Sequence, residues 1–92
     1  MNSKFIKNYL QVLLLNNNRI KFATKNHFTS MANLRNIELY NNLLEKFEPE
    51  RPLNYLTNLD LSENRIVQLS NLEAPSLKRL NLKNNSLAVS LN

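Results

Sequence analysis

Leucine and isoleucine recur along this chain at a spacing that neither a single strand nor a single helix produces. In residues 55–69, "YLTNLDLSENRIVQL", Leu59 and Leu61 flank a polar residue as in a half-buried strand. Asn64 and Ile66 follow at intervals of three and two residues, which fit neither the strand period nor the helical one. A spacing of this kind indicates a structural unit only if it recurs along the chain.

The same frame of five positions occurs four times. Its copies are "LQVLLLNNNRI" from Leu10, "LRNIELYNNLL" from Leu34, "LTNLDLSENRI" from Leu56 and "LKRLNLKNNSL" from Leu77. The starts lie 24, 22 and 21 residues apart, and all twenty framework positions are Leu, Ile or Asn. Four matches of five positions are very improbable by chance. They predict stacked repeats, in which no single unit can bury its apolar face alone.

The frame resembles the L-x-x-L-x-L-x-x-N-x-L consensus of the leucine-rich repeat family. The resemblance covers residues 9–92 and includes both the typical repeat and a shorter one of about 22 residues. It implies an α/β fold, namely a short curved solenoid with a parallel β-sheet on its concave face. Short helices or extended segments would form the convex face. Residues 1–9 would be an N-terminal lead or partial cap, and residues 10–92 four repeats, the last one incomplete.

The asparagine of each frame has a structural role that the resemblance implies. Asn18, Asn42, Asn64 and Asn85 are expected to form a ladder that bonds the backbone of neighbouring turns. The physical reason is that the chain turns inward after each strand, and buried backbone groups need partners that an amide can supply. The chain holds 18 asparagines and no glycine, which has two explanations: asparagine takes the left-handed turn positions that glycine usually fills, or the codon bias of an AT-rich genome raises its frequency.

The segments between the strands differ in their predicted structure. Phe28, Met31 and Leu34 are spaced by three residues and predict one short helical face. Pro49 and Pro52 interrupt the following segment, which is therefore predicted to be extended rather than helical.

The strand residues that point away from the core form the predicted partner-binding surface, which we call the concave face. Its three columns are Val12, Asn36, Asn58 and Arg79; Leu14, Glu38, Asp60 and Asn81; and Asn16, Tyr40, Ser62 and Lys83. The face is apolar at its N-terminal end, acidic in the middle and basic at its C-terminal end. Tyrosine is enriched in binding hot spots, and the acidic middle favours a partner with a basic segment. The alternative is a solvated face whose charges pair with one another.

The sequence predicts a binding protein and not an enzyme. Glu38 and Asp60 would lie about 4.8 Å apart on adjacent strands, near the spacing of the carboxylates in retaining glycosidases. An open strand face offers such a pair no pocket. His27 is the only histidine and there is no cysteine, so no metal site and no cofactor are predicted.

The net charge of +5 and the pI of about 9.8 leave nucleic-acid binding as a weaker alternative. The basic residues are scattered rather than clustered, and acidic residues occupy the middle of the concave face. The longest apolar run, residues 12–15, is too short to cross a membrane.

The compartment depends on whether the chain is complete. The absence of cysteine and of a signal-peptide pattern in residues 1–15 favours the cytoplasm for the chain as it stands. The fourth repeat stops before its convex half, which favours a fragment of a longer repeat protein or a partner that covers this end. A fragment of an extracellular recognition receptor is the second reading, and Asn84 would then be a glycosylation sequon.

Overall fold

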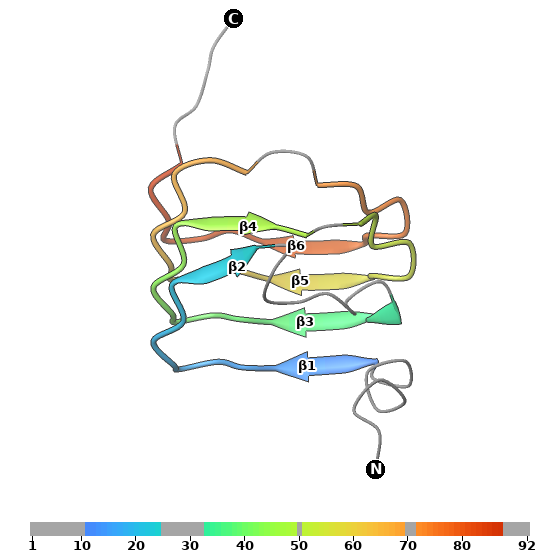
Figure 1. The fold of residues 1–92 in the computed structure, drawn as a ribbon, viewed down its shortest axis with the longest axis horizontal. Helices are drawn as coiled ribbons and strands as arrows, with labels where there is room; N and C mark the ends of the chain where they lie inside the picture. The colour runs from blue at the N-terminus through green and yellow to red at the C-terminus, as the bar shows by residue number, and fades with distance from the viewer. Residues whose placement is uncertain (1–10, 25–32, 50, 70–71, 88–92) are drawn as a thin grey trace, which may run out of the picture.

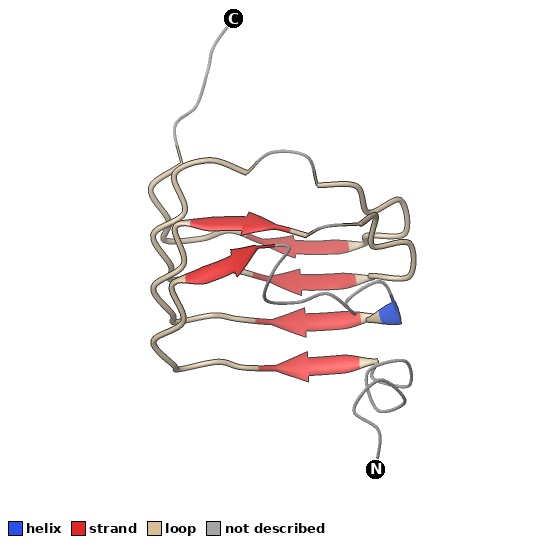
Figure 2. Ribbon diagram, in the orientation of Figure 1, coloured by secondary structure: helices blue, strands red, loops and turns tan. Residues whose placement is uncertain are grey.

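The fold is built from six three-residue strands, which form two parallel sheets whose strands run in opposite directions (Figure 1). The computed structural model describes residues 11–24, 33–49, 51–69 and 72–87. The strands are β1 (Val12–Leu14), β2 (Phe22–Thr24), β3 (Asn36–Glu38), β4 (Lys46–Glu48), β5 (Asn58–Asp60) and β6 (Arg79–Asn81). Strands β1, β3, β5 and β6 form one parallel sheet in that order, and β2 and β4 form a second. Within the described ranges only Asn33 is helical (Figure 2).

The register of the four-stranded sheet follows the spacing of the sequence frames. Val12 pairs with Asn36, Asn36 with Asn58, and Asn58 with Arg79. Because these pairs are offset by 24, 22 and 21 residues, each frame stacks directly on the next. The alternate residues, of which Ile37 and Leu59 are central, point into the core. The predicted parallel sheet of a solenoid is therefore confirmed.

The core is complete only where a strand has neighbours on both sides. Ile37 and Leu59 have no exposed surface, whereas Leu80 on the edge strand β6 is 44% exposed. Leu13 on the opposite edge is partly buried. The central framework residues are fully or almost fully buried: Leu34, Ile37, Leu39, Leu44, Leu56, Leu59, Leu61 and Ile66. The framework leucines are therefore equivalent in sequence but not in the apolar surface that they remove from water.

The predicted asparagine ladder is present. The Oδ1 atoms of Asn42, Asn64 and Asn85 each accept a hydrogen bond from a backbone N–H of the preceding turn, at 2.9–3.1 Å. Their Nδ2 groups donate to carbonyls of their own turn and of the preceding one. Asn18, at the start of the column, is exposed, and among the described residues its side chain bonds only carbonyls of its own turn, those of Leu15 and Asn16.

A left-handed residue precedes each ladder asparagine. Asn17, Asn41, Glu63 and Asn84 have φ angles between 53° and 60°. Three of these four positions are asparagine, the residue that tolerates this region best after glycine. The expectation that asparagine replaces glycine in the turns is thus confirmed at three positions. Glu63 is the exception, and it occupies the same conformation without a short polar side chain that bonds locally.

The convex side carries the two-stranded sheet β2–β4. Ala23 pairs with Phe47, and both side chains are fully buried. A small residue beside a large one lets the two strands pack closely against the core. The extended structure predicted for the proline-containing segment is present at its start, where β4 runs up to Pro49, and none of the described residues from 49 to 53 is helical. The helical face predicted at Phe28 and Met31 and the N-terminal lead lie outside the described residues.

Two equivalent turns lead the chain back toward β5 and β6. The N–H of Leu56 donates to the carbonyl of Leu53, and the N–H of Leu77 donates to that of Ala74. Pro75 occupies the second position of the latter turn, where its fixed φ angle is favourable. These turns set the position of the residues that stand beside the starts of β5 and β6.

Candidate functional site

The structure brings the predicted concave-face residues together in adjacent rows. The pairs Leu14–Glu38, Glu38–Asp60 and Asp60–Asn81 are direct neighbours across the sheet. Val12 and Leu14 are 47% and 58% exposed and form an apolar end on β1. Arg79 and Lys83 are exposed at the other end, around β6. Whether these residues bind a partner remains a prediction.

The acidic centre of the face is held in place by uncharged groups. Asn36 Nδ2 donates to Glu38 Oε2 at 2.9 Å, and Asn16 Nδ2 donates to Glu38 Oε1 at 3.4 Å. The Oδ1 atom of Asp60 accepts hydrogen bonds from the N–H of Ser62 at 3.0 Å and from its Oγ at 2.7 Å. These donors fix the orientation of both carboxylates but do not neutralise their charge. Two half-buried negative charges therefore lie side by side at the carboxyl ends of β3 and β5.

The third column of the face includes a buried residue at its centre. Ser62 is only 9% exposed, and Tyr40 is half-buried. The backbone N–H of Tyr40 donates to Asn16 Oδ1 at 2.8 Å, and its carbonyl accepts from Asn17. The Tyr40 segment is thus anchored from the neighbouring strand, while the Ser62 hydroxyl orients Asp60.

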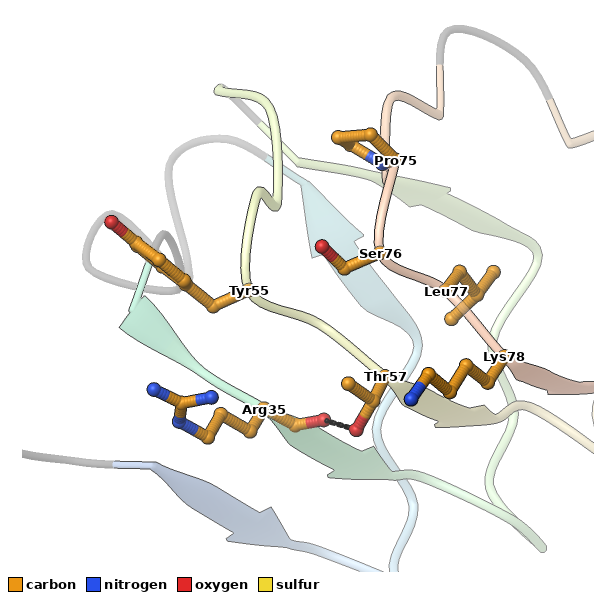
Figure 3. A pocket seen from close by; sticks show the side chains of 7 residues that line it. All are labelled: Arg35, Tyr55, Thr57, Pro75, Ser76, Leu77 and Lys78. Carbon is orange, nitrogen blue, oxygen red and sulfur yellow. Dashed lines mark hydrogen bonds between the residues drawn. The ribbon is translucent and has the colours of Figure 1, made fainter.

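A second surface feature lies at the opposite ends of the strands, and the sequence analysis missed it. We call it the strand-start groove. It has a volume of about 380 Å³ and is lined by Arg35, Tyr55, Thr57, Pro75, Ser76, Leu77 and Lys78 (Figure 3). A hollow of about 250 Å³ continues it past Thr57 and Lys78 to Asn58 and Arg79. The signal in the sequence was the basic character of Arg35 and Lys78, which share one position of the repeating frame.

The groove is not at Glu38 or Asp60, and within the described ranges no three His, Cys, Asp or Glu residues gather as metal ligands would. His27 lies outside those ranges. Across the part of the chain that the structure describes, no helix has the length and apolar character that a membrane span requires.

Comparison with known proteins agrees with this geometry. A family model described as leucine rich repeat matches residues 8–66. Human epiphycan is 38% identical over 72 residues, which cover 76% of this chain and 22% of epiphycan. Zebrafish (Danio rerio) tubulin-specific chaperone E is 49% identical over 57 residues, which cover 55% of this chain and 11% of the chaperone.

The chain therefore spans about a fifth of epiphycan and about a ninth of the chaperone. No solved structure matches at the stringency applied to these relatives. The family model covers more than half of the chain, and the residues that it matches include β1, β3, β5 and the ladder residue Asn64. The chain belongs to the leucine-rich repeat family.

Proposed function

We propose that this protein binds a protein partner through the concave face, and that the partner presents a basic segment to Glu38 and Asp60. The family is generally a non-enzymatic binding scaffold, which supports the class of function. The observation that carries the finer proposal is the paired, uncompensated charge of the two carboxylates on neighbouring strands.

The position of the pair suits recognition of a cation. Glu38 ends β3 and Asp60 ends β5, the two strands of the sheet that have neighbours on both sides. Their backbone is therefore fixed by ladder hydrogen bonds, and their oxygens are oriented before a ligand arrives. A lysine or arginine placed between them would form charge-assisted hydrogen bonds without a large cost in ordering the site. Glu63, exposed at the rim, adds negative charge beside the pair.

The apolar end of the face offers a second contact. Val12 and Leu14 lie one strand away from the acidic pair, on the same surface. A partner segment with apolar residues on one side of its lysine or arginine would bury this surface and place its cation over β3 and β5. Burial of this apolar surface contributes to binding even where single contacts contribute little.

The test uses a fluorescein-labelled twelve-residue peptide with alternating arginine and leucine, followed by fluorescence anisotropy. The variant Glu38→Gln/Asp60→Asn keeps the size of both side chains and one acceptor oxygen of each, and it removes both charges. The matched control Glu45→Gln/Glu73→Gln removes two charges at exposed positions away from the face. We expect about a tenfold loss of affinity in the first variant, since two charge-assisted contacts are lost, and less than a twofold loss in the control. Equal losses in both would refute a specific acidic site.

Tubulin is a specific partner to test, because the name of the zebrafish relative supplies it and the two chains are 49% identical where they align. We propose it as the first full-length protein to be titrated against the labelled chain. Saturable binding that the Glu38→Gln/Asp60→Asn variant weakens would support tubulin as a ligand of this face. Absence of binding would remove tubulin and leave the peptide test of the face unaffected.

A further inference from the structure

We propose that the strand-start groove is a second docking site, and that it takes an acidic segment of a protein partner. The groove is separate from the concave-face carboxylates, and the inference does not depend on the function proposed for them. It rests on the shape of the groove, on the sign of the charges around it and on the way one of its cations is held.

The walls of the groove are fixed by backbone and hydroxyl contacts. Thr57 Oγ1 donates to the carbonyl of Arg35 at 3.0 Å, and the N–H of Lys78 donates to the carbonyl of Thr57 at 2.9 Å (Figure 3). Ser76 Oγ donates to the carbonyl of Asn54 at 2.8 Å and ties together the two turns that precede β5 and β6. The groove is therefore a preformed feature of three stacked repeats, and a ligand would not have to organise it.

The charged residues of the lining are all cations. Arg35, Lys78 and Arg79 line the groove and its continuation, and the lining includes no aspartate or glutamate. All three side chains are exposed. Among the described residues none of the three has a carboxylate partner, so their charges are available to a ligand. In Figure 3 the Lys78 side chain extends toward Thr57, on the side of the groove where Arg35 lies.

Arg35 is preorganised by an aromatic side chain. Its guanidinium carbon lies 5.7 Å from the centre of the Tyr55 ring, which is within the range of a cation–π contact. Tyr55 is itself 53% exposed, so its ring offers a flat apolar surface beside the charge of Arg35. The contact restricts the arginine without neutralising it, and a guanidinium held in this way can bind a carboxylate through two parallel hydrogen bonds.

The surrounding charge favours an acidic peptide over a nucleic acid. Strands β3 and β5 start beside the groove and end at the concave-face carboxylates, so Arg35 and Glu38 stand about 10 Å apart along β3 at the usual rise per residue. A continuous phosphate backbone that crossed the sheet along the strands would meet these negative charges. A peptide segment with two or three acidic residues needs only the groove, and an apolar or aromatic residue beside them would contact Tyr55 and Pro75.

The experiment measures binding of the peptide GEEYGEEYGEEG, labelled with fluorescein at its N-terminus and amidated at its C-terminus, to the full chain by fluorescence anisotropy at about physiological ionic strength. Lys78→Glu reverses one charge in the groove. Lys46→Glu makes the same change of net charge on the convex strand β4, at another exposed lysine. We expect the groove variant to bind about tenfold more weakly than the parent and the control variant to remain within twofold. The same peptide with glutamine at every glutamate should not bind.

Three results would overturn the proposal. The first is an equal loss of affinity in the two variants, which would indicate attraction by net charge alone. The second is binding of the glutamine peptide that is as strong as binding of the glutamate peptide. The third is displacement of the labelled peptide by single-stranded DNA at a lower concentration than by unlabelled peptide. Circular dichroism of both variants checks the fold, and Arg35→Gln supplies a second groove variant that should weaken binding if Lys78→Glu unfolds. The Lys78→Glu variant is also titrated with the arginine–leucine peptide. That second measurement reports on the concave face alone, so a failure of the groove proposal can be distinguished from a failure of the concave-face proposal.

Discussion

Replacing Asn64 by leucine removes the central member of the asparagine ladder while keeping a side chain of similar size. The Asn64 side chain is 7% exposed and makes four hydrogen bonds of 3.0 Å. Its Oδ1 accepts from the N–H of Leu44. Its Nδ2 donates to three carbonyls, those of Leu39, Leu61 and Ser62.

The expected cost follows from what each partner loses. All three carbonyls keep a second donor: Nδ2 of Asn42, Nδ2 of Asn85 and the N–H of Asn41, respectively. The N–H of Leu44 has no other acceptor in the part of the chain that the structure describes, and it is buried. One buried, unpaired N–H costs about 1–3 kcal/mol. Leucine adds apolar burial that offsets part of the weakened carbonyl contacts, so we expect Asn64→Leu to lower the free energy of unfolding by about 2 kcal/mol.

Urea unfolding followed by circular dichroism measures this loss. A slope of about 1 kcal/mol per molar urea, ordinary for a chain of this size, would lower the midpoint by about 2 M. Asn18→Leu is the matched control, because Asn18 occupies the same frame position but is exposed, and within the described residues its side chain accepts no hydrogen bond from a backbone N–H. Its midpoint should change by less than about 0.5 M, as for other surface substitutions. The argument from buried backbone groups would be refuted if Asn64→Leu lowered the urea midpoint by less than about 0.5 M. It would also be refuted if the two variants lost the same amount of stability.

Three further substitutions test the fold. Glu63→Asn should raise the thermal midpoint by an amount equivalent to about 0.5–1 kcal/mol, because asparagine tolerates the φ of 53° better than glutamate; an unchanged or lower midpoint would contradict this. Leu59→Ala should cost about 2–5 kcal/mol in urea unfolding, since Leu59 is fully buried between two strands. Leu80→Ala, at the equivalent position but 44% exposed, should cost less than half as much, and a similar cost at both positions would show that edge and centre are packed alike.

Much of the architecture was predictable because the repeating frame is unusually regular. The recurrence of leucines predicted parallel strands, and the spacing of the frames predicted which residues pair across the sheet, such as Glu38 with Asp60. Pro49 and Pro52 predicted the extended convex segment that contains β4. The strand β2 was not predicted, because Phe22–Thr24 is too short to show an alternation of its own and is defined by its pairing with β4.

The strand-start groove could not be predicted in the same way. Its residues come from three repeats, and no local pattern distinguishes Tyr55 or Ser76 from any other turn residue. The two turns must stack before Tyr55 contacts Arg35 and before Lys78 stands beside Thr57. The sequence showed the charges but not that they gather around one hollow without an acidic neighbour.

The resemblance to the leucine-rich repeat family implied the role of the ladder asparagines. The sequence by itself determined the repeat, the direction of the strands and the identity of the core positions. These follow from local rules, because alternation and frame spacing fix which side chain faces inward and how far the next strand is offset. Only the tertiary structure decided how much each framework leucine is buried, as Leu59 and Leu80 show. It alone decided which carboxylates and cations become neighbours. Burial and charge proximity depend on what lies on both sides of a repeat, and a repeat's own residues carry no information about that.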